Sequence, residues 1–139
     1  MRGLPDATAD HDVDAAVRAF LGSLPATRRI ATARGDLLRC HGTGEEDMVT
    51  VTPDDAGYAL ETNGALQKLL RDASLRWMVC GHSHRRMVRR IGSLTIINAV
   101  TLHRDHSPCF GIVDLGGTPR VTFFENVEGA MVVVDEVPM

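Results

Sequence analysis

Apolar side chains recur along the chain at two different spacings, one typical of helices and one typical of strands. Between Asp12 and Leu24 they return every three or four positions, which predicts a helix with Asp12 as its N-cap. The same spacing from Ala65 to Ala73 predicts a second helix, for which Asn63 is the expected N-cap.

Short runs rich in valine and isoleucine, separated by Gly, Pro or Asp, predict the strands. Residues 29–33 and 36–41 form a predicted hairpin whose turn glycine, Gly35, supplies a positive φ. Residues 43–62 are acidic and punctuated by Gly and Pro, so we expect a long loop that could include a short strand at 48–52. After the second helix, we predict a strand and then a β meander, at residues 76–80, 87–91, 94–98, 110–115, 121–125 and 131–134.

This order of elements and an ordinary globular composition, 44% apolar and 24% charged, indicate an α/β fold with one domain over residues 1–139. The net charge of -3 gives no reason to expect nucleic acid or an anionic membrane as partner. The acidic N-terminus and the lack of a long apolar run lead us to expect a soluble protein without a secretory signal or membrane span. Cys40, Cys80 and Cys109 show no CxxC spacing, which favours a reducing, cytoplasmic setting.

Three of the six histidines follow predicted strands and suggest a metal site. His82 and His84 lie in "VCGHSHRR", where residues i and i+2 face the same side if the strand direction persists and Gly81 lets the backbone bend. His41, in "RCHGTGEEDM", is the obvious third ligand. Imidazole suits Zn, Fe and Ni, but on chemistry alone a metal site and an ordinary polar loop remain alternatives.

The ordered set of these motifs resembles a known family. Strand-"CHG", "GHSH" after an apolar strand, and a strand-turn-strand ending in "IINA" resemble the C-terminal half of the calcineurin-like metallophosphoesterases. The most similar branch is the small bacterial members, which carry "GNHD", "HG", "GHTH" and "NPGS" in that order. The resemblance runs roughly from Asp10 to Leu115 and implies a two-sheet sandwich flanked by helices, with the N-terminal half missing from this chain.

The resemblance also implies a two-metal centre at the strand ends. His41 and His82 resemble ligands of one ion, and His84 resembles a ligand of the other. "ADHD" stands where "GNHD" is expected, so that Asp10 would be an oxygen ligand and His11 the catalytic histidine. Alternatively, the acids of residues 10–12 only cap the following helix. The implied cofactors are two divalent transition metal ions (Mn, Ni, Fe or Zn), and the implied reaction is hydrolysis of a phosphate mono- or diester by a metal-bound hydroxide.

The chain departs from the family pattern in ways that put catalysis in doubt. It lacks the DxH and GDxxD motifs that supply the metal-binding carboxylates, and "NPGS" appears as residues 98–101, "NAVT". The chain could be the downstream piece of a longer or split enzyme, which we favour, a degenerate relative, or an independent module. The alternative function is a catalytically inactive module that binds an anion or a protein.

Exposed apolar faces of a partial sandwich also predict self-association or a complementing N-terminal segment. Beside the histidines, Arg85 is the best candidate for contact with a phosphoester small molecule, because guanidinium groups bind phosphate. We expect the other arginines of residues 86–90 to lie on a solvated strand face. Cys40 and Cys80 are expected to be buried and unreactive, and Trp77 to lie in the core.

Overall fold

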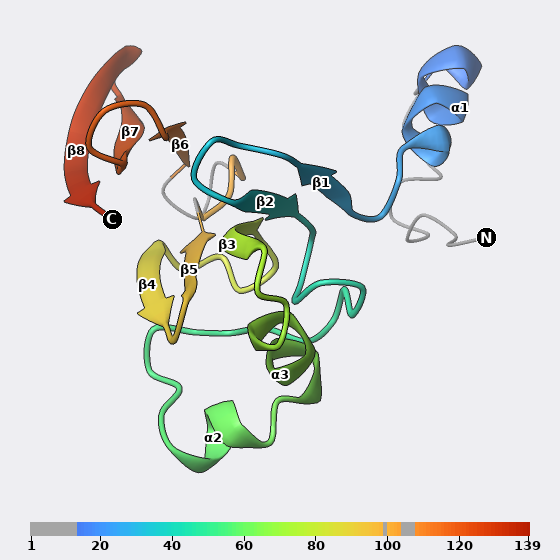
Figure 1. Ribbon diagram of the computed structural model, residues 1–139. Coiled ribbons are helices and arrows are strands. Elements are labelled where there is room, and N and C mark those ends of the chain that lie inside the picture. The colour runs from blue at the N-terminus through green and yellow to red at the C-terminus, as the bar shows by residue number, and fades with distance from the viewer. Residues whose placement is uncertain (1–13, 99, 104–107) are drawn as a thin grey trace.

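Two β-sheets organise the computed structural model, which describes residues 14–98, 100–103 and 108–139 (Figure 1). The five-stranded sheet contains, in spatial order, β1 (Arg28–Ile30), β2 (Asp36–Arg39), β3 (Leu75–Cys80), β5 (Leu94–Asn98) and β4 (Met87–Ile91). The three-stranded sheet contains, in spatial order, β6 (Cys109–Asp114), β7 (Arg120–Val127) and β8 (Ala130–Pro138). The helices of the described residues are α1 (Ala15–Ser23), α2 (Tyr58–Glu61) and α3 (Gly64–Leu70).

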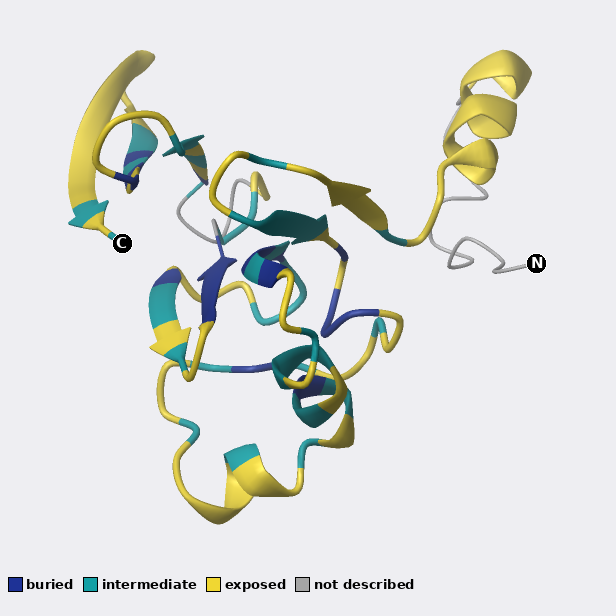
Figure 2. Cartoon of the chain, in the orientation of Figure 1, coloured by how far each residue is buried: buried dark blue, intermediate teal, exposed yellow. Residues whose placement is uncertain are grey.

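The larger sheet has a parallel centre and antiparallel edges. β2, β3 and β5 run parallel, while β1 pairs antiparallel with β2 and β4 pairs antiparallel with β5. Every residue of β5 is buried, as expected for a strand covered on both faces (Figure 2). This sheet therefore forms the middle layer of the fold.

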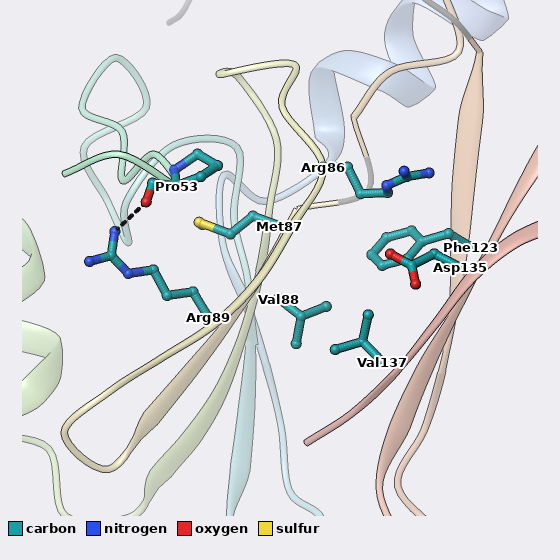
Figure 3. A pocket seen from close by; sticks show the side chains of 8 residues that line it. All are labelled: Pro53, Arg86, Met87, Val88, Arg89, Phe123, Asp135 and Val137. Atoms are coloured by element: carbon teal, nitrogen blue, oxygen red, sulfur yellow. Dashed lines mark hydrogen bonds between the residues drawn. The ribbon is translucent and has the colours of Figure 1, made fainter.

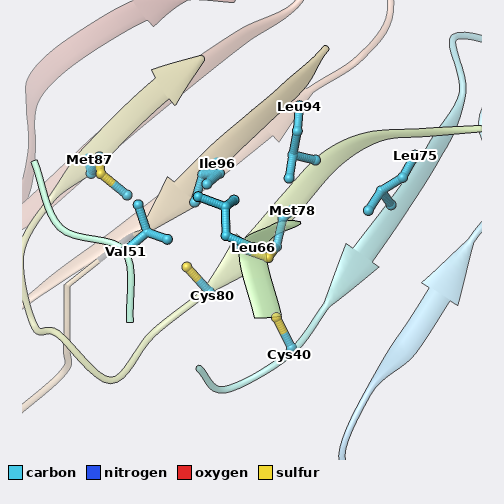
Figure 4. Packing of buried hydrophobic residues seen from close by; sticks show 9 residues of the cluster. All are labelled: Cys40, Val51, Leu66, Leu75, Met78, Cys80, Met87, Leu94 and Ile96. Atoms are coloured by element: carbon cyan, nitrogen blue, oxygen red, sulfur yellow. The ribbon is translucent and has the colours of Figure 1, made fainter. Parts of the chain in front are cut away.

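Two apolar clusters cover the two faces of this middle sheet. Neighbouring residues of β5 point to opposite faces, so Ile96 belongs to one cluster and Ile97 to the other. On the first face, Leu66 of α3 and Val51 of the long loop pack against the strands (Figure 4). On the second face, the three-stranded sheet contributes its buried residues, Cys109, Val121 and Phe123. The predicted two-sheet α/β architecture is confirmed.

The helix caps follow the sequence closely. The Asn63 side chain accepts a hydrogen bond from the Leu66 N–H at 2.9 Å, as predicted for the N-cap of α3. At α1 the capping residue is Asp14 instead of Asp12, and its Oδ1 accepts from the Ala16 N–H at 2.6 Å. Within the described residues, none of the helices has the length and apolar character needed to cross a membrane.

Strand positions are predicted well, but one pairing is not. The hairpins β1–β2, β4–β5 and β6–β7 form as predicted, and Gly35 has the expected positive φ of 108°. The predicted meander does not continue through one sheet, because β4 and β5 belong to the five-stranded sheet whereas β6, β7 and β8 form the other. The strand before the meander, β3, pairs in parallel with β5, which leaves β4 at the sheet edge. Sequence spacing could not reveal this, since it locates strands without saying which of them are neighbours.

The possible strand at residues 48–52 does not form. An arginine side chain, and no strand, donates hydrogen bonds to carbonyls at the end of this segment. Val51 is buried in the first cluster, and Arg89 of β4 donates to the Thr52 carbonyl at 2.8 Å and the Asp55 carbonyl at 2.6 Å. Arg89 therefore fixes the loop, and the expectation that it lies on a solvated strand face is wrong. The short helix α2 also lies within the segment predicted to be loop.

The helix α1 presents an exposed apolar side. None of its residues is buried, and it lies apart from the sheets in Figure 1, with Val17, Phe20 and Leu21 exposed on one side. We expect self-association that increases with protein concentration and is weakened by Phe20→Asp, because the charge interrupts this apolar side. Sedimentation velocity over a range of concentrations measures it.

A suitable control is Ala19→Asp, which adds the same charge on the opposite side of the helix. Wild-type protein that sediments as a monomer at every concentration contradicts the prediction, as does an equal effect of both substitutions.

Candidate metal centre at the histidine turns

The parallel pairing of β2 and β3 brings two of the predicted histidines together. Their C-terminal ends lie at the same edge of the sheet, and His41 and His82 each come two residues after the end of one of these strands. Nε2 of His41 lies 3.1 Å from Nδ1 of His82. The two rings are nearly perpendicular, at 82°, with centroids 5.1 Å apart.

Backbone hydrogen bonds hold these two residues in place beyond the strand ends. The Cys40 N–H donates to the Val79 carbonyl at 3.1 Å, and the Gly81 N–H donates to the His41 carbonyl at 2.8 Å. The pairing of the two strands therefore continues up to the histidines, which fixes the distance between their Cα atoms.

The backbone around His82 turns sharply and is not extended. The Ser83 N–H donates to the Gly81 carbonyl at 2.8 Å, and both His82 and His84 adopt a positive φ, 64° and 52°. The argument that residues i and i+2 of a strand face the same side therefore does not apply to His82 and His84. In the described part of the chain, no three His, Cys, Asp or Glu side chains form a group suited to hold a metal ion. The role of His84 as a metal ligand therefore stays a prediction.

The glycine that the site requires is Gly42 and not Gly81. A Cβ at Gly42 would lie 2.4 Å from the carbonyl oxygens of both Glu46 and Asp47, because the loop folds back over this position. A Cβ at Gly81 would make only ordinary contacts, 3.7 Å and more, with His41. The "CHG" motif thus contains a glycine needed for close backbone approach, a signal that sequence analysis did not use.

The geometry of the imidazole pair fits two ligands of one ion. Nitrogens that each lie about 2.0–2.1 Å from a shared ion are separated by about 2.8–3.4 Å when the angle between them is 90–110°. The observed 3.1 Å between the rings of His41 and His82 falls within this range. A hydrogen bond between one protonated and one unprotonated nitrogen has a similar length, so the pair is also stable without an ion.

The predicted Asp10 and His11 lie outside the described residues.

Arg85 is exposed and forms an ion pair with the exposed Asp54. This contact raises the pKa of Arg85 and lowers the pKa of the Asp54 carboxyl, so both groups stay charged at neutral pH. The guanidinium belongs to the segment that follows the histidines, as predicted for a substrate contact, but it already has an anionic partner. Its role in binding substrate stays a prediction.

Arg86 connects the histidine turn to the second sheet. Its guanidinium lies 5.6 Å from the centre of the Phe123 ring and pairs with Glu125 at 3.3 Å. Together with Val88, Val137 and their neighbours it lines an open pocket of about 460 Å³ between β4 and the three-stranded sheet (Figure 3). Of the predicted metal ligands, the three within the described residues, His41, His82 and His84, do not line this pocket. Arg86 therefore contacts the second sheet while staying exposed, as expected, although it lies just before β4 and not within the strand.

Comparisons with known proteins identify the fold. No family model matches the sequence, and no curated protein matches it. Among solved structures, Vps29 of Chaetomium thermophilum matches with a TM-score of 0.60 and 15% identity, over 86% of this chain and 62% of that one. Vacuolar protein sorting 29 of Cryptosporidium parvum matches with a TM-score of 0.57 and 20% identity, over 85% and 60% of the two chains. Wild-type Vps29 of Entamoeba histolytica, complexed with Zn²⁺, matches with a TM-score of 0.55 and 18% identity, over 84% of this chain and 62% of that one.

These similarities establish that the two-sheet fold is that of the Vps29 structures. The chain spans less than two thirds of the length of the Vps29 structures that it matches. At such low sequence identity the likeness concerns the fold, and the roles of individual residues rest on the geometry described above.

The two glycines offer a matched pair of substitutions. We expect Gly42→Ala to lower the free energy of unfolding by about 1–3 kcal/mol, because the new methyl group collides with two backbone carbonyls. We expect Gly81→Ala to change it by less than about 0.5 kcal/mol. Urea denaturation followed by circular dichroism measures both values, and equal values for the two variants contradict this account of the turn.

The buried thiols predict that stability falls at alkaline pH. Burial raises the pKa of Cys80 to about 12, so the folded chain keeps this proton at pH values where the unfolded chain, with an ordinary thiol pKa of about 9, has released it. The unfolded state then binds fewer protons, and the free energy of unfolding decreases as pH rises from about 9 to about 12. Denaturation midpoints measured across this range should decrease less for Cys80→Ala than for wild type.

An independent check is labelling of the native protein with a thiol reagent at pH 8. All three cysteines are buried and free, so labelling should be slow until denaturant is added. Rapid labelling of Cys80 in the folded protein would contradict the burial argument.

Proposed function

We propose that His41 and His82 bind a divalent transition metal ion, and that this site serves the hydrolysis of a phosphate ester. The observation that supports the proposal is the 3.1 Å separation of the two ring nitrogens at the ends of adjacent parallel strands. An ion bound there would stabilise negative charge on a phosphoryl oxygen and would lower the pKa of a water molecule. Imidazole nitrogen suits Zn, Fe and Ni, with Mn also included by the family resemblance.

Further residues complete the proposed site. Two imidazoles alone hold an ion weakly, so Asp10 and His84 are proposed as additional ligands and His11 as the catalytic histidine, as the resemblance implies. Arg85 would bind the phosphate of the substrate by exchanging one anionic partner for another. Its ion pair with Asp54 is exposed to solvent, which makes such an exchange easy. The free thiols are in keeping with the proposed cytoplasmic setting.

A second candidate is a catalytically inactive module that binds a protein. The similar structures are of proteins named for vacuolar protein sorting. Part of the outer face of the three-stranded sheet is apolar. One row across this sheet consists of Phe110, Phe124 and Val133, with the two phenylalanine rings stacked at 5.1 Å. Ile112 and Met131 are exposed beside this row, and together these residues form an apolar surface typical of protein interfaces.

Metal titration tests the proposed ion site. We expect Zn²⁺, Ni²⁺ or Mn²⁺ to raise the melting temperature of the wild-type protein, because an ion at about one hundred times its Kd adds about 2.7 kcal/mol of stability. His41→Ala and His82→Ala should each abolish this shift, since either substitution removes one of the paired nitrogens. His103→Ala, which changes a histidine outside the pair, should retain it.

Hydrolysis of a bis-aryl phosphodiester and an aryl monophosphate separates the two candidate functions. Metal-dependent turnover that His41→Ala eliminates supports the hydrolase. A metal-induced shift without turnover favours the binding module. A wild-type protein whose melting temperature no metal changes contradicts the ion site itself.

A further inference from the structure

The path of the chain places one buried side chain directly beneath the histidine turn. Because β5 lies between β3 and β4, the connection over residues 81–86 must cross the C-terminal end of β5. Asn98 is the last residue of β5 and is the register partner of both Cys80, which ends β3, and Met87, which begins β4. Its side chain is therefore surrounded by the start and the end of the turn.

Asn98 is fully buried, and both the nitrogen and the oxygen of its carboxamide are hydrogen-bonded. Its Nδ2 donates to the Gly81 carbonyl at 2.7 Å and lies 2.9 Å from Oγ of Ser83. Its Oδ1 accepts from the Val100 N–H at 2.9 Å. These partners fix which end of the amide is nitrogen and which is oxygen. The Gly81 carbonyl can only accept a hydrogen bond, so Nδ2 must face it, and the Val100 N–H can only donate, so Oδ1 must face that group.

The two partners of Nδ2 lie on either side of His82. This histidine has a φ of 64°, in the left-handed region that residues other than glycine seldom adopt. Such a conformation persists only where surrounding contacts impose it. Hydrogen bonds from one buried group hold the backbone carbonyl of Gly81 before the histidine and the side-chain hydroxyl of Ser83 after it, and so restrain the turn on both sides.

We propose that Asn98 is a positioning residue of the metal site, and that its buried carboxamide holds the backbone of His82 so that Nδ1 faces Nε2 of His41. The functional part of this inference rests on the proposed ion site, whereas the positioning of the ring does not. The requirement is specific to asparagine. Aspartate lacks the N–H donors for the Gly81 carbonyl, and alanine offers neither donor nor acceptor.

The test compares Asn98→Ala and Asn98→Asp with Ile97→Val. Ile97 is the neighbouring residue on β5, is equally buried, and packs in the second cluster away from the turn. Its shortening lowers stability without removing a hydrogen bond, so it controls for a merely structural effect. Two quantities are measured at a temperature where each variant is folded: zinc affinity by calorimetry, and ring proximity in metal-free protein by NMR contacts between the labelled imidazoles of His41 and His82.

We expect both Asn98 variants to bind zinc at least about tenfold more weakly than wild type, because the loss of a residue that orients a metal ligand typically weakens metal binding by that factor. Both variants should also lose the NMR contact between the rings. Ile97→Val should keep both. Retention of the ring contact in Asn98→Ala overturns the inference, and so does an equal loss in Ile97→Val.

Two further results remain decisive. If wild-type protein binds no zinc, the ion site fails, and the ring contact in metal-free protein alone decides the role of Asn98. If neither Asn98 variant folds, Ser83→Ala removes one partner of the same carboxamide. Weakened ring contact in this variant supports the inference, and wild-type contact overturns it.

Discussion

The parallel pairing of β2, β3 and β5 is the constraint on which the site depends. Parallel strands end at the same edge of a sheet, so the chain segments that follow them must share that edge. His41 follows β2, His82 follows β3, and Asn98 ends β5. The three residues are far apart in sequence, and the strand register brings them to one place before any side-chain interaction between them forms.

The buried middle sheet makes this edge rigid. β5 is buried along its whole length, with α3 and the long loop on one face and the three-stranded sheet on the other. Close packing on both faces leaves the strand ends little freedom, because side chains from both layers interlock with those of the sheet. Loops at such an edge can adopt strained conformations, as His82 and His84 do with their positive φ angles.

Arginines hold neighbouring segments of the fold in place. Arg89 donates to carbonyls of the long loop, Arg86 bridges to Glu125 of the second sheet, and Arg29 of β1 pairs with Asp36 and with Asp72 at the beginning of the turn to β3. Each contact links residues from different elements. The basic residues after the histidines therefore include structural contacts, and the proposed contact of Arg85 with substrate stays a prediction.

The local structure could be predicted from the sequence alone. The spacing of apolar residues located the two longer helices and nearly every strand, and Asn63 was identified as a cap, because these features depend on residues close in the chain. The motifs also indicated His41 and His82 correctly as partners in space. Sequence could not give the pairing of β3 with β5, the need for glycine at position 42, or the contacts of Asn98 and Arg86. The tertiary structure decided those, because each depends on which distant backbone segments lie side by side.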